Sequence, residues 1–135
     1  MLKILKDNTV HIEIGWANNW CKCCDNYWDD VPYRLLAAVD HVNRTGMPKS
    51  VQLNADGYDF IIVFNVSETH IIRHYDDNFN LYTVDVSIKD VTRELVADVR
   101  RDIVAWSEWG DRSDFEAEER KLDLESWCRV IEKRL

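Results

Sequence analysis

Three cysteines, Cys21, Cys23 and Cys24, are crowded into four positions of the sequence. Cys21 and Cys24 have the Cys-x2-Cys spacing with which two thiolates can hold a zinc ion. A complete site would need further ligands, such as His11 or Cys128, and the sequence contains no second Cys-x2-Cys and no histidine pair near these cysteines. Adjacent cysteines bridge one another poorly. We therefore predict reduced thiols and no bound metal, with Cys128 packed as a small apolar residue on the inner side of a helix.

His70 and His74 are four residues apart, a spacing that brings two side chains together on a helix. Residues 69–75 alternate as a strand does, however, and a strand rises by ~3.3 Å per residue. The two imidazoles would then lie ~13 Å apart, too far to share one ion. The pair is therefore not expected to bind a metal.

Known catalytic motifs are absent from the sequence. It has neither the Gly-x-Ser-x-Gly elbow of hydrolases nor a glycine-rich phosphate loop. Residues 76–80 contain carboxylates and amides, but they lack the glycine and the distal glutamate of a calcium loop. We expect neither an enzyme nor a cofactor. Two alternatives stay open: a small metal- or ligand-binding domain centred on Cys21, Cys23 and Cys24, and a small enzyme of unknown reaction.

The elements that must position these residues can be placed from periodicity and end signals. Residues 10–16 alternate as a half-buried strand, and residues 18–28 form an irregular aromatic and cysteine segment. A helix is expected from Asp29 or Asp30 as the cap, with Pro32 in its first turn and an end at Gly46.

Strands are predicted at 51–54, 58–66, 69–75 and 81–88, with turns at Asp56-Gly57 and at 76–78. Asp90 caps a predicted helix over 91–106, and Gly110 interrupts the helical pattern. Ser113 and Glu116 then form a capping box at the start of the last helix. The predicted fold is α+β: a single antiparallel sheet of about five strands, with one wet face and one face covered by three helices.

Length and charge restrict the classes of function. A chain of 135 residues is expected to form one domain, 1–135. Its formal net charge of −8 argues against nucleic-acid binding, which needs cations against the phosphates. No apolar run approaches a membrane span, and the first residues are too soon charged for a signal peptide. We expect a soluble, cytoplasmic protein.

The charge is unevenly distributed along the chain. Residues 51–88 hold six acidic residues against Arg73 alone, whereas residues 31–50 hold one acidic residue and three basic ones. An excess of one sign on one side of a fold attracts a partner of the opposite sign. Acidic residues at turns also have a local role in backbone hydrogen bonds, which accounts for half of the six.

A small, acidic, tryptophan-rich α+β chain without a catalytic motif resembles the immunity proteins of bacterial toxin systems. The resemblance implies a cytosolic protein that binds and neutralises a cognate toxin, often a basic nuclease, by covering its active site. In this interpretation an acidic face meets the basic cleft of the toxin, and aromatic side chains anchor the contact. The expected partner-binding residues are Asp59, Glu68, Asp76, Asp77 and Asp85, with Tyr75, Tyr82 and Trp20 as anchors.

Overall fold

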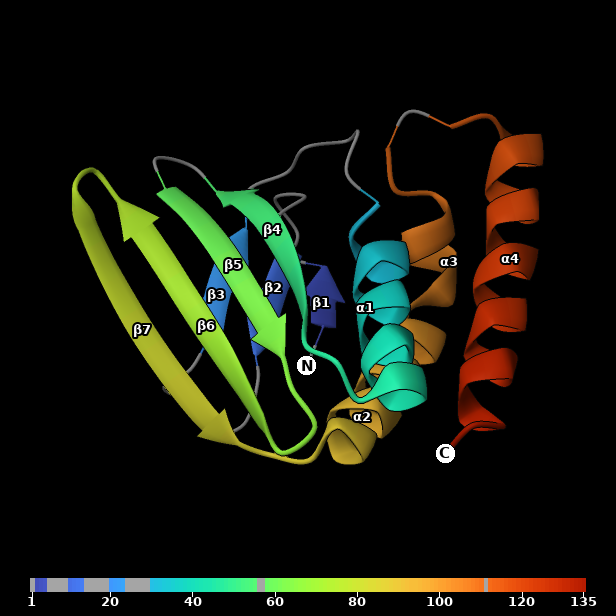
Figure 1. The fold of residues 1–135 in the computed structure, drawn as a ribbon. Helices are drawn as coiled ribbons and strands as arrows, with labels where there is room; N and C mark the ends of the chain where they lie inside the picture. Colours follow the sequence, from blue (N-terminus) through green and yellow to red (C-terminus); the bar gives the residue numbers. More distant parts are fainter. Residues whose placement is uncertain (1, 5–9, 14–19, 24–29, 56–57, 111) are drawn as a thin grey trace.

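The computed structural model describes residues 2–4, 10–13, 20–23, 30–55, 58–110 and 112–135 (Figure 1). Along the chain, three strands are followed by a helix, four more strands and three helices. Every strand pair is antiparallel. The predicted α+β class with an antiparallel sheet is therefore confirmed.

The larger sheet has four strands: β4 (Lys49–Ala55), β5 (Tyr58–Phe64), β6 (Glu68–Tyr75) and β7 (Asn78–Asp85). They pair in sequence order as a meander, as predicted. Ala55 lies opposite Tyr58, which confirms the first hairpin, although Asp56 and Gly57 themselves lie outside the described residues. The β6–β7 hairpin turns at Asp76, whose φ of 50° is in the left-handed region that aspartate tolerates better than most residues.

A second, three-stranded sheet departs from the prediction of a single sheet. It comprises β1 (Leu2–Ile4), β2 (Val10–Glu13) and β3 (Trp20–Cys23), in that spatial order. The chain thus has seven described strands in two sheets rather than about five in one. Strand β3 lies within the segment expected to be irregular, and positions 14–16 of the expected first strand lie outside the described residues. Figure 1 shows this small sheet behind the four-stranded one.

Helix α1 (Val31–Thr45) begins and ends as its local signals predict. The Asp30 side chain accepts a hydrogen bond from the backbone N–H of Tyr33, and Pro32 occupies the first turn. Gly46 closes the helix in the left-handed conformation, with its N–H donating to the carbonyl of Val42. Asp30 also forms an ion pair with Arg120, which fixes the start of α1 against α4.

The C-terminal part is helical, as predicted, with one additional break. Helix α2 (Ile88–Arg101) ends at Asp102, and the short α3 (Ile103–Ser107) follows. Helix α4 (Asp114–Glu132) begins at the predicted cap, where Ser113 accepts from the N–H of Glu116. Ile88 starts α2 instead of ending a strand, and Ser87 rather than the predicted Asp90 caps this helix, because its hydroxyl accepts from the N–H of Asp90 at 3.1 Å. Within the described residues, none of the helices could cross a lipid bilayer, for want of length or apolar character.

The core lies between one face of the four-stranded sheet, the helices and β2. We call this face of the larger sheet the inner face. Its buried side chains are Val51, Leu53, Phe60, Ile62, Phe64, Thr69, Ile71 and Val84. Val10 and Ile12 of β2 join the same cluster, as do Leu35, Leu36 and Val39 of α1.

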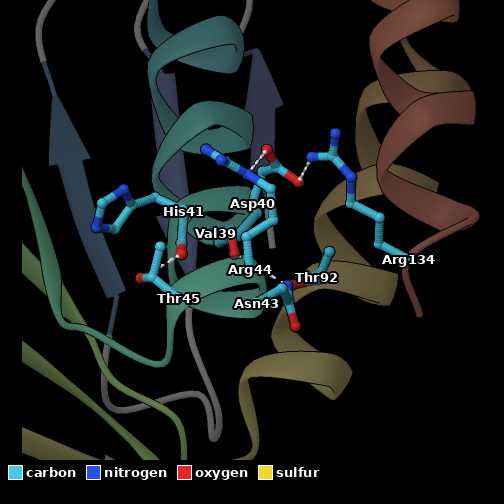
Figure 2. A network of polar contacts seen from close by, with 8 residues as sticks. All are labelled: Val39, Asp40, His41, Asn43, Arg44, Thr45, Thr92 and Arg134. Carbon is cyan, nitrogen blue, oxygen red and sulfur yellow. Dashed lines mark hydrogen bonds and ion pairs between the residues drawn. The ribbon is translucent and has the colours of Figure 1, made fainter.

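A polar network around the buried Asp40 ties α1 to α2 and to the residues after α4 (Figure 2). The carboxylate of Asp40, 1% exposed, accepts from Arg44 at 2.9 Å and from Arg134, beyond α4, at 2.5 Å. Asn43 donates to the Thr92 hydroxyl on α2 at 2.8 Å. The buried carboxylate is thus compensated by two guanidinium groups, as a charge in the interior must be.

Candidate functional site on the open sheet face

The face of the four-stranded sheet opposite the core is open to solvent. We call it the outer face. Side chains alternate along each strand, so the cross-strand register identifies its members. They are Ser50 and Gln52 on β4, Asp59, Ile61 and Val63 on β5, Glu68, His70, Ile72 and His74 on β6, and Phe79, Leu81, Thr83 and Asp85 on β7.

An apolar row crosses the middle of the outer face. Ile61 pairs with Ile72, and Ile72 pairs with Leu81, so these three side chains follow one another across β5, β6 and β7. Leu81 is 64% exposed and Phe79, one alternate position along β7, is 69% exposed. Apolar side chains that lie together and face water are typical of a surface that binds a partner.

Acidic side chains border this apolar row at one end of the sheet. Glu68 of β6 lies directly opposite Asp85 of β7. Two carboxylates in such a cross-strand pair repel each other, which costs the folded protein stability. The nearby imidazole of His70 lies 3.2 Å from Glu68 and 2.9 Å from the Thr83 hydroxyl, so both of its ring nitrogens have partners.

Asp59 lies on the opposite side of the apolar row. Its carboxylate lies 3.9 Å from His74, whose ring stacks on Phe79 at a centroid distance of 4.4 Å. Asp76 and Asp77 lie just beyond, in the exposed β6–β7 turn. Acidic groups therefore lie on both sides of the apolar row, displaced from it along the strands.

The outer face carries no lysine or arginine among its described members. Arg73 is the only basic residue of segment 51–88, and strand alternation places it with Ile71 on the inner side. Its guanidinium lies 5.4 Å from the ring centroid of Phe60 and 5.9 Å from that of Tyr82. Because the Arg73 guanidinium points to the inner side, the described basic groups next to the carboxylates of the outer face are the imidazoles of His70 and His74.

The predicted partner-binding residues do not all lie together. Asp59, Glu68 and Asp85 lie on the outer face, with Asp76 and Asp77 at its end. Tyr82, in contrast, is on the inner side, half-buried against the core. Tyr75 is exposed at the end of β6, on the inner side by alternation. Trp20 belongs to β3 of the other sheet.

The residues that the sequence analysis considered as possible metal ligands can be placed in part. His70 and His74 do lie on a strand, β6, where each has its own neighbours. No group of three or more histidine, cysteine or acidic residues that could hold a metal ion occurs among the described residues. Cys21 and Cys23 lie in β3, and Cys24 lies outside the described residues.

Cys128 lies in α4 and is fully buried, as predicted. Burial raises the pKa of its thiol from 9.0 to about 11; nearby Arg100 opposes this shift, and Glu132 and Glu125 add to it. At neutral pH the thiol is protonated and is therefore a poor nucleophile and metal ligand.

The apolar row was missed in the sequence, although a signal for it exists. Residues 60–64 are apolar without interruption, and Ile71 is followed directly by Ile72. In an alternating strand, such runs must place apolar side chains on both faces of the sheet. The outer face is therefore apolar at its centre rather than simply wet.

Comparison of the chain with protein-family models, with curated proteins and with solved structures gave no match.

Proposed function

We propose that this chain is a protein-binding inhibitor of the immunity type, and that its outer face binds and covers a basic active site on a bacterial toxin. The observation that carries the proposal is the apolar row of half-buried Ile61 and Ile72 and exposed Leu81, which has acidic groups on both sides and no described lysine or arginine. Interfaces commonly combine such an apolar centre with a charged rim.

The two parts of the outer face have different physical tasks. Leu81 and Phe79 are exposed, so burying them against a partner removes apolar surface from water, at about 25 cal/mol per Å². The acidic rim accelerates the encounter with a basic partner and orients it. A nuclease cleft that binds phosphates presents cations, which makes it complementary to this rim.

Inhibition by this route is steric and electrostatic. A partner cleft occupied by the outer face cannot admit a nucleic acid, because both ligands compete for the same cations. The inhibitor itself needs no catalytic group. The unfavourable pair of Glu68 and Asp85 also has an explanation, since a cation placed between two carboxylates converts their repulsion into attraction.

The test is the kinetics of association with the purified product of a toxin gene adjacent to the gene of this chain, measured across a salt series. The double substitution Asp59→Lys and Asp85→Lys should lower the association rate constant by roughly tenfold or more at low ionic strength. The difference should shrink as salt is added, because the Debye length falls from ~30 Å at 0.01 M to ~8 Å at 0.15 M.

A matched control separates a local from a global charge effect. Glu118 and Asp123 are exposed on α4, and replacing both by lysine changes the net charge by the same amount. This control should bind at nearly the wild-type rate. Equal slowing by the two double substitutions, or the absence of binding, would refute the proposal.

A further inference from the structure

A second surface, with the opposite sign of charge, lies between α1 and β4. It is a groove of about 380 Å³. Four of its lining residues carry a positive charge or gain one on protonation: Arg34, His41 and Arg44 from α1, and Lys49 from β4. The small side chains of Ala37 and Ala38 leave space between these four residues. None of the described lining residues is acidic. In a chain with a net charge of −8, this is a local reversal of sign.

Both guanidinium groups of the groove, those of Arg34 and Arg44, are held in place by contacts within the protein. Arg34 donates to the backbone carbonyl of Gln52 at 2.6 Å, which fixes its side chain across the β4 end of the groove. Arg44 donates from Nε to Asp40 at 2.9 Å. A cation that is already ordered loses less side-chain entropy when it binds an anion.

The positive charge of the groove is not neutralised by Asp40. That carboxylate also accepts from Arg134, so a single negative charge is shared by two arginines. Figure 2 shows the His41 side chain directed away from Asp40 and Arg134. His41 therefore offers its ring to the groove side of α1, where one ring nitrogen of the neutral form is an N–H donor.

We infer that this groove binds a small ligand carrying phosphate groups. Its volume lies at the lower end of the range of about 300–1,000 Å³ for ligand sites. Arg34, Arg44 and Lys49 carry permanent positive charges, which favour a ligand with more than one negative charge. A guanidinium donates to two phosphate oxygens at once, and a lysine ammonium supplies a point charge beside it. The inference is independent of the inhibitor function, because it concerns a different surface.

The test uses inorganic pyrophosphate as the probe, by calorimetry at low ionic strength and by amide NMR. We expect saturable binding with a dissociation constant of about 1 mM or tighter, and chemical-shift changes concentrated at Arg34, His41 and Lys49. Lys49→Gln should weaken binding roughly tenfold. Lys89→Gln, at an exposed position of α2, removes the same charge elsewhere and should leave the affinity unchanged.

A second variant tests the shape of the groove at constant charge. Ala37→Leu keeps the helix and fills the groove, so it should also weaken binding. Equal affinities of the Lys49 and Lys89 variants would overturn the inference, as would pyrophosphate binding that Ala37→Leu leaves intact, since either result indicates diffuse attraction. Citrate binding as tightly as pyrophosphate would overturn the assignment to phosphate.

Discussion

Arg134 lies 94 positions after Asp40 in the sequence, and its Nη1 lies 2.5 Å from the Oδ1 of that buried carboxylate. The exposed fractions of the two side chains are 40% and 2%. The segment after α4 is thus held to the middle of α1 by the ion pair of Arg134 with the buried carboxylate of Asp40. The other carboxylate oxygen, Oδ2, accepts from Arg44 of the same helix. Asp40 therefore links α1 to the residues after α4.

We predict that Asp40→Asn lowers the free energy of unfolding by about 3 kcal/mol. The substitution removes the negative charge and leaves Arg44 and Arg134 competing for one neutral amide oxygen. Breaking a buried ion pair by neutralising one partner costs ~3–5 kcal/mol, and the partial exposure of the arginines puts this case at the lower end. Denaturation in urea at neutral pH, followed by circular dichroism, measures the difference.

Asp90→Asn is the matched control, since Asp90 pairs with Arg93 at 3.1 Å on the surface of α2. Exposed pairs of this kind contribute about 0–1 kcal/mol. If the two substitutions cost the same, the burial of Asp40 has no energetic consequence and the interpretation is wrong.

Cys128 should make the folded protein less stable in alkali. Its pKa is raised to about 11 in the folded state, above the ordinary value of 9.0. Below about pH 9 the thiol is protonated in both states and has no effect. Between 9 and 11 the unfolded chain loses this proton and the folded chain keeps it, so unfolding becomes easier as the pH rises.

The expected result is that the stability advantage of the wild type over Cys128→Ala shrinks as the pH rises from about 9 to about 11. Alkylation followed by peptide mapping gives an independent measurement. Cys128 should react with iodoacetamide far more slowly in the folded protein than in denaturant. Rapid labelling of the native protein at this residue would contradict its burial.

Position 46 has space for a side chain, but its left-handed backbone conformation is unfavourable for residues other than glycine. Its φ is 70°, and a Cβ built at this position meets no other atom within 4 Å. Gly46→Ala should therefore cost only the left-handed backbone penalty of about 1 kcal/mol. Gly46→Asn should cost less, because asparagine enters this region more readily. Thermal unfolding of the two variants checks the order, and an unchanged melting temperature in both would contradict it.

Local signals predicted both ends of α1 and the start of α4 correctly because the interactions that define them lie within a few residues, whereas the predicted Asp90 cap of α2 was wrong because Ser87 caps that helix. The Asp30 cap, the Gly46 end and the pair of Ser113 and Glu116 all follow from short-range hydrogen bonds. Strand β3 was missed because its pairing with β2 is a tertiary contact that neither cysteine spacing nor aromatic content reports. The break at Asp102 was missed for a similar reason, since no glycine or proline marks it.

The candidate site was predictable only in its charge. Acidic residues could be counted in segment 51–88, and strand alternation placed Asp85 on the solvent side. The same alternation puts Tyr82 on one face with Val84, which is buried, so Tyr82 lies on the inner side and not on the outer face where a partner-binding anchor was expected. The basic groove was present in the sequence only as three cations in segment 31–50. Its existence depends on the packing of α1 beside β4, which no local pattern specifies.

Leu81 and Tyr82 are neighbours on β7 with side chains on opposite faces of the sheet, so truncating them should have opposite consequences. Tyr82 packs against the core and lies under the guanidinium of Arg73. Tyr82→Ala should therefore cost about 2 kcal/mol of stability, less than the ~3–5 kcal/mol of a fully buried aromatic residue.

Leu81→Ala should change the free energy of unfolding by no more than about 0.5 kcal/mol, because the side chain is 64% exposed. Against the proposed toxin partner the order should reverse. Leu81→Ala should raise the dissociation rate constant, since an apolar anchor at the centre of an interface acts mainly on dissociation. Tyr82→Ala, measured under conditions where it is fully folded, should dissociate at the wild-type rate. If Tyr82→Ala accelerates dissociation and Leu81→Ala does not, the partner contacts the inner side of β7, and the outer face is not the binding surface.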